Sequence, residues 1–162
     1  FDFDLDASAF LLGKNGKVLK DEDFVFYGNQ NARTGAVMSM GDDTSGGNSE
    51  DGDDEQIFID FTKVPPEIEK IAITVTIYDS DVRHQNFGQV STAYVRVARV
   101  SSTSDTTGTE VLRFDLGEEF SVETALVVCE IYRNGSEWKF NAVGAGYQGG
   151  LYALCKSFGV NV

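Results

Sequence analysis

The sequence has few of the residues that mark disulfide-rich, zinc-binding or membrane-spanning proteins. It contains two cysteines, one histidine and two prolines, and no segment approaches the roughly 18 apolar residues that a membrane helix needs. Cys129 and Cys155 lie in the apolar segments VVCEI and YALCKSF, which favours buried free thiols over a disulfide or a zinc site. His84 has no cysteine near it in the sequence, so we interpret it as a surface or structural histidine. Free thiols and the lack of a disulfide framework suit a reducing compartment, so we expect a cytoplasmic protein.

Basic residues are also scarce. Thirteen Lys and Arg stand against 26 Asp and Glu, which gives a formal charge of −13. A domain of this charge repels phosphate backbones and anionic membranes, so we expect neither nucleic-acid binding nor membrane insertion. The first residues, FDFDLD, are acidic and strand-like, unlike a signal peptide. With 162 residues, of which 41% are hydrophobic, the chain is long enough for one domain with a normal core.

What the sequence does contain is a succession of short segments rich in β-branched and aromatic residues, separated by turn residues. An Asn-Gly pair at residues 15–16 is a hairpin signal after the first segment. The pattern predicts about nine strands, over residues 1–12, 23–28, 36–40, 57–61, 71–79, 92–100, 111–116, 125–133 and 137–143.

No helical segment separates these strands, so antiparallel sheets are expected. After a glycine-rich stretch at 144–150, which we interpret as a turn, apolar residues recur at helical spacing between Leu151 and Phe158. Gly159 is placed to end this helix. The sequence therefore predicts an all-β fold, a two-sheet antiparallel β-sandwich with a short C-terminal helix.

The most acidic segment is GDDTSGGNSEDGDDE, from Gly41 to Glu55. It holds seven acids, no Lys or Arg and no apolar residue, so it cannot be a buried element. Like charges at this density repel one another, while the glycines let the backbone turn tightly and direct carbonyl oxygens inward. Carboxylate, amide and carbonyl oxygens are the ligands of calcium, which takes about six to eight of them. The candidate ligands in this loop are Asp42, Asp43, Asp53, Asp54 and Glu55.

A second acidic group, Asp2, Asp4 and Asp6, alternates along the first predicted strand. On a strand these residues share one face at intervals of about 6.6–6.8 Å, where bare carboxylates are unfavourable. A cation or neighbouring N–H donors would relieve the repulsion, but the residues are also compatible with a solvated acidic face. The segment DFDLDA opens like a helix-loop-helix calcium site, but Ala7 and Gly13 stand where that loop needs Gly and Glu, so we reject that motif.

Sequence motifs typical of catalytic sites are weaker than the acidic pattern of candidate metal ligands. There is no G-x-S-x-G motif and no phosphate-binding glycine loop in a suitable context. Glu130 interrupts an apolar strand, and we expect a structural ion pair with Arg83, Arg96 or Arg133. Asp79 ends its strand, where it would either cap the next turn or add a metal oxygen.

Four ordered blocks of the sequence can be compared with a known family. The first is FDFDLDASAFLL followed by GKV and DEDFVFY, and the second is GDD followed by DGDDEQI. The third is IYDSDVRHQNFGQV, and the fourth is EIYRNGSEWKFNAVGAGYQGGLYALCKSFGV. Together they resemble the TerD family of tellurium-resistance and stress proteins nearly end to end. The resemblance implies a calcium-binding sandwich whose ligands are Asp2, Asp4 and Asp6 of the first strand with Asp42, Asp43, Asp53, Asp54 and Glu55 of the acidic loop.

The strands that precede the DFDLDAS block in this family are missing from the sequence. We therefore interpret residues 1–162 as a single TerD-like domain that lacks its N-terminal strands, so that either the domain is truncated or a partner supplies them. The resemblance implies a non-enzymatic, calcium-binding stress-response protein that acts through protein or membrane-associated complexes, with protein partners. Two alternatives stay open: a calcium-dependent carbohydrate- or phospholipid-binding sandwich, and a hydrolase that uses a pair of carboxylates.

Overall fold

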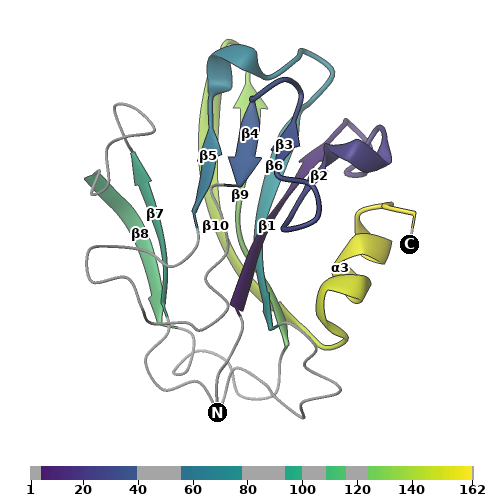
Figure 1. Ribbon diagram of the computed structural model, residues 1–162. Coiled ribbons are helices and arrows are strands. Elements are labelled where there is room, and N and C mark those ends of the chain that lie inside the picture. Colours follow the sequence, from purple (N-terminus) through teal and green to yellow (C-terminus); the bar gives the residue numbers. More distant parts are fainter. Residues whose placement is uncertain (1–4, 40–55, 78–93, 100–108, 116–123, 162) are drawn as a thin grey trace.

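Within the residues that the structure describes, the protein folds as two antiparallel layers of β-strands with one short α-helix (Figure 1). The computed structural model describes residues 5–39, 56–77, 94–99, 109–115 and 124–161. In the larger layer, five strands are hydrogen-bonded in the order β10-β9-β6-β1-β2. Their bounds are Leu5–Leu12 (β1), Phe24–Val25 (β2), Lys70–Ile77 (β6), Ala125–Asn134 (β9) and Glu137–Tyr147 (β10). The predicted antiparallel β-sandwich with a C-terminal helix is confirmed.

The second layer consists, among the described residues, of a three-stranded and a two-stranded sheet. These strands are Asn31–Ala32 (β3), Val37–Ser39 (β4), Ile57–Ile59 (β5), Tyr94–Arg99 (β7) and Thr109–Asp115 (β8). Both pieces pack on the same face of the large sheet. Ile71 of β6 shares a core with Val37 of β4, and Val75 of β6 shares one with Val97 of β7. Ile71 and Val75 are an even number of residues apart on one strand, so they point to the same side.

Helix α3 (Gly150–Ser157) covers the opposite face of the large sheet. Leu11 of β1 points toward the second layer, whereas its neighbour Phe10 packs with Leu154 of the helix. Burial on both faces explains why the sequence AFLL in β1 is continuously apolar. Gly159 ends the helix with φ +81°, as predicted for a C-cap glycine. In the part of the chain that the structure describes, no helix has the length and apolarity to cross a membrane.

Strand β10 is longer than the sequence predicts. The sequence places a turn from Gly144 onward, but the strand reaches Tyr147. Its pairing with β9 shifts register between Ala142 and Ala145 and then continues. Gly144, with φ +61°, supplies the backbone conformation that such a bulge needs. The two-residue strand β3 is also absent from the prediction, because so short a segment shows no periodicity.

Candidate functional site

One of the eight predicted metal-binding residues, Asp6, lies in the described part of the chain. It is on β1, paired with Thr76 of β6, and it is only 3% exposed. Within the described ranges, no three Asp, Glu, His or Cys side chains are grouped as metal ligands would be. The other predicted ligands lie outside those ranges: Asp2, Asp4, Asp42, Asp43, Asp53, Asp54 and Glu55. The ligand set therefore stays a prediction.

Asp6 belongs to a strip of buried polar side chains on the helix-covered face of the large sheet. This buried polar strip comprises Asp6, Ser8, Thr74, Thr76 and Thr124. Thr124 joins the strip to the helix, because its hydroxyl accepts a hydrogen bond of 3.0 Å from the N–H of Gly150. The hydroxyl of Ser8 is fully buried and has no hydrogen-bond partner among the described residues. A buried hydroxyl without a partner costs about 1–3 kcal/mol, so the strip contains an oxygen with unused bonding capacity.

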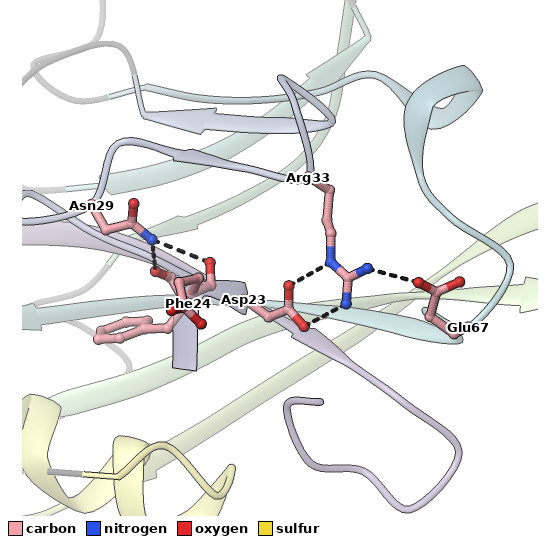
Figure 2. A network of polar contacts seen from close by, with 6 residues as sticks. Asp23, Phe24, Asn29, Arg33 and Glu67 are labelled. Carbon is pink, nitrogen blue, oxygen red and sulfur yellow. Dashed lines mark hydrogen bonds and ion pairs between the residues drawn. The ribbon is translucent and has the colours of Figure 1, made fainter. Parts of the chain in front are cut away.

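A buried ion-pair network joins the two layers, and the sequence analysis missed it (Figure 2). Arg33 lies between β3 and β4, and its Nε and Nη2 donate to the two carboxylate oxygens of Asp23 at 2.7 and 2.9 Å. Asp23 is fully buried in the short helix η1 (Asp21–Asp23), just before β2 of the large sheet. Nη1 of Arg33 donates to the exposed Glu67 at 2.7 Å. Asp23 and Arg33 are ten residues apart in the sequence. Acid and arginine residues at such a separation are common in proteins, so the sequence alone does not indicate this contact.

The hydrogen bond to Asp23, more than any other contact, raises the pKa of Arg33 above its ordinary value. The guanidinium is therefore charged at every pH at which the protein is folded. The two layers are joined by a permanent positive charge, so neither carboxylate loses its partner by deprotonation of the arginine.

Arg33 reaches Asp23 from a strained backbone. Arg33 and Thr34 have φ values of +52° and +55°, and Gly35 follows at +92°. The left-handed region costs residues other than glycine about 1–2 kcal/mol, and a β-branched residue such as Thr34 is a genuine outlier there. The carboxamide of Asn31 stabilises the turn, since its Oδ1 accepts a hydrogen bond of 2.7 Å from the N–H of Gly35. The ion pair and this hydrogen bond hold a conformation that Thr34 itself disfavours.

We expect Thr34→Asn to raise the free energy of unfolding by about 0.5–1 kcal/mol, because Asn adopts the left-handed region more readily than Thr. Thr34 is exposed, and its side chain bonds to no other described residue. Urea unfolding with linear extrapolation measures the change. The matched control is Thr109→Asn, at an exposed threonine in β8, where Asn is disfavoured. Equal effects of the two variants would contradict the assignment of strain to Thr34.

Glu130 forms a structural ion pair, as expected, and the partner that the structure shows is Lys70, which the sequence analysis did not name. Its Oε2 lies 3.1 Å from Nζ of Lys70 on the neighbouring strand β6. Arg133 instead donates to backbone carbonyls of residues 64–68 and stacks on Trp138 at 4.4 Å. Residues three apart on a strand point to opposite faces, so Arg133 lies on the other side of the sheet. Arg83, another expected partner of Glu130, lies outside the described ranges, as do Asp79 and His84.

The two cysteines are free and buried, as predicted. Burial raises the pKa of the Cys129 thiol to about 12 and that of Cys155 to about 11. Both groups are therefore protonated at neutral pH, and the reactive thiolate form is disfavoured. Their surroundings give them a packing role.

Comparison with known proteins gives a consistent result. The family model described as the TerD domain matches residues 1–158. Tellurium resistance protein TerD of Serratia marcescens is 50% identical over 160 residues, which cover 99% of this chain and 80% of that protein. General stress protein 16U of Bacillus subtilis is 44% identical over 161 residues, with the same coverage of both chains.

The fold is also similar to that of a solved structure. A homologue of the telluride resistance protein TerD from Streptomyces coelicolor A3(2) has a TM-score of 0.76, with 95% of this chain and 85% of that chain covered. The two chains share 22% sequence identity, so this likeness supports the fold alone.

Proposed function

The chain belongs to the TerD family, and from this premise we propose that it is a calcium-binding, non-enzymatic stress-response protein. Its relatives are named for tellurium resistance and general stress. In this proposal the calcium ligands come from the first strand and the acidic loop. They are Asp2, Asp4, Asp6, Asp42, Asp43, Asp53, Asp54 and Glu55.

The burial of Asp6 within the buried polar strip is the observation that carries this proposal. An ionised carboxylate removed from water is costly unless its charge is compensated. Every polar side chain of the strip carries oxygen and none carries nitrogen, and the oxygen of Ser8 has unused capacity. Such surroundings suit a hard cation such as calcium. Asp2 and Asp4 precede Asp6 at the period of a strand and add two more carboxylates to the same sequence pattern.

The proposed mechanism is electrostatic. A calcium ion adds two positive charges to a protein whose formal charge is −13, and it reduces the repulsion among the clustered acids. We propose that the calcium-bound form presents a docking surface to protein partners of a stress-response complex. The free, buried cysteines suit a reducing compartment, and we propose a cytoplasmic location.

We expect calcium to raise the melting temperature of the protein. A ligand that binds only the folded state contributes about 2.7 kcal/mol at one hundred times its Kd. For a domain of this length, that free energy corresponds to about 5–10 °C. Differential scanning calorimetry in millimolar calcium chloride, compared with magnesium chloride and with a chelator, measures the shift. No shift and no heat of binding in millimolar calcium would contradict the proposal.

Asp6→Asn tests the residue on which the proposal rests, because it removes the charge with little change in volume. We expect it to remove more than half of the calcium-induced shift. The matched control is Glu137→Gln, which removes an exposed negative charge from the opposite end of the large sheet. This control should leave the shift unchanged. An equal loss in both variants would mean that calcium acts through net charge and not through a site at Asp6.

A further inference from the structure

Helix α3 covers only part of its face of the large sheet. The helix packs on apolar residues such as Ala72 and Val127. Farther along the strands the same face becomes polar, with Glu130 paired across from Ala72 and Tyr132 paired across from Lys70. An open depression of about 590 Å³ lies there, and we call it the polar depression. The side chains that line it include Lys14, Lys70, Glu130, Tyr132 and Asn141.

Several polar groups in this depression are not used within the described structure. The ammonium group of Lys14, the hydroxyl of Tyr132 and the amide of Asn141 make no hydrogen bond or ion pair with another described residue. The side chains of Lys70 and Glu130 pair with each other but are 37% and 25% exposed, so each can also contact a ligand. The depression is open and its lining is polar and charged, so the ligand that it suits is small and polar, held at the surface by ionic contacts and hydrogen bonds.

The charges that line the depression decide which class of ligand it suits. Lys14 and Lys70 are positive, while Glu69 and Glu130 are negative. Arg133 also borders the depression, but its guanidinium is bonded to backbone carbonyls on the other side of the sheet. A simple cation would meet two basic groups at short range. A simple anion would meet two carboxylates and the repulsion of a protein with a formal charge of −13. A molecule that carries both charges is neutral overall, and it can place each end beside the group of opposite sign.

We propose that the polar depression binds a small zwitterion of the α-amino-acid class. Its carboxylate lies beside Lys14 and Lys70, and its ammonium group lies beside Glu130. Tyr132 and Asn141 supply further hydrogen bonds. This site is independent of the proposed calcium site, because Asp6 lies toward the other end of the same face.

A titration of the full chain with the free L-amino acids, one at a time, tests the proposal. Calorimetry and ¹H–¹⁵N NMR detect binding, in calcium and in a chelator. We expect at least one amino acid to bind in both conditions and to shift amide signals of β9 and β10 around Glu130 and Asn141. The N-acetyl derivative of that amino acid keeps only the carboxylate charge, and the carboxamide derivative keeps only the ammonium charge. Each should bind about tenfold more weakly, because each loses one ionic contact; a tenfold change in Kd corresponds to about 1.4 kcal/mol.

Two variants and one control locate the binding. Lys14→Met and Tyr132→Phe should each weaken binding about fivefold, which is within the range for one lost polar contact. Lys139→Met removes an exposed lysine that is paired with Tyr132 on β10 but does not line the depression, and it should bind normally. Failure of every amino acid to bind, equal binding of the singly charged derivatives, or equal weakening by Lys139→Met would overturn the proposal. The calcium response is measured separately, so these failures are distinct from failure of the calcium site.

Discussion

Asp23→Ala is expected to lower the free energy of unfolding by about 3–5 kcal/mol, the loss typical of removing one partner from a buried ion pair. Asp23 is 0% exposed and accepts two hydrogen bonds from Arg33. The variant leaves a largely buried guanidinium with Glu67 as the remaining acid of its network. Arg33 cannot relieve the cost by losing its proton, because guanidinium groups stay charged in proteins. Urea unfolding measures the loss as a lower midpoint at unchanged slope.

The same guanidinium offers a matched control. Glu67→Gln removes the other acid of the network, but Glu67 is exposed to solvent, so the expected loss of stability is far smaller than that of Asp23→Ala. Amide hydrogen exchange measures the local effect. Asp23→Ala should reduce the protection of the β4 amides, because the ion pair holds the β3–β4 turn against the start of β2. Equal losses in the two variants would show that burial of Asp23 does not decide the strength of this network.

Phe10→Ala is the second change with a large expected effect, a loss of about 3–5 kcal/mol. The Phe10 side chain is fully buried between the large sheet and the C-terminal segment. Its ring stacks on Phe24 with centroids 4.5 Å apart, and it lies 4.6 Å from the ring of Phe158 beyond the helix. Removing the ring leaves a cavity where β1, β2 and the end of α3 meet. Thermal and urea unfolding measure the loss, and faster proteolysis after α3 would show that the helix has loosened.

Two controls separate the cavity from general effects of substitution. Phe10→Leu keeps an apolar side chain at the site and should cost less than the alanine variant, about 1–2 kcal/mol. Tyr152→Ala removes an aromatic ring from the exposed face of α3 and should change stability by about 0.5 kcal/mol or less. If Phe10→Ala were no more harmful than Tyr152→Ala, the aromatic cluster would not hold the helix on the sheet.

Most of the fold could be predicted because its signals are local. The strand β1, the helix α3 and the cap at Gly159 follow from side-chain periodicity and turn chemistry within a few residues. The errors occur where a distant contact overrides the local signal. Gly144 indicates a turn by itself, yet pairing with β9 carries the strand through it as a bulge. Register likewise gives Glu130 a partner on β6, which no spacing along the chain predicts.

The candidate sites divide in the same way. The acidic residues proposed as calcium ligands can be recognised in the sequence, because charge density and alternation are properties of the chain itself. Asp6 is the one member whose burial the structure describes, and the sequence pattern by itself left it equally compatible with a solvated face. Neither the Asp23–Arg33 pair nor the polar depression has a sequence signal, because each combines residues from segments that only pairing brings together.

By itself, the sequence determined that this protein is acidic and forms an antiparallel β-sandwich with a short C-terminal helix, because composition, periodicity and turn residues act over short distances. The resemblance of whole sequence blocks added the TerD family. Only the tertiary structure decided which polar groups are buried and which partner each charge meets. The physical reason is that burial and pairing depend on strand register and on which layer covers each face. A shift of one residue in register would exchange the two faces of a strand, and with them the core, the ion pairs and the sites.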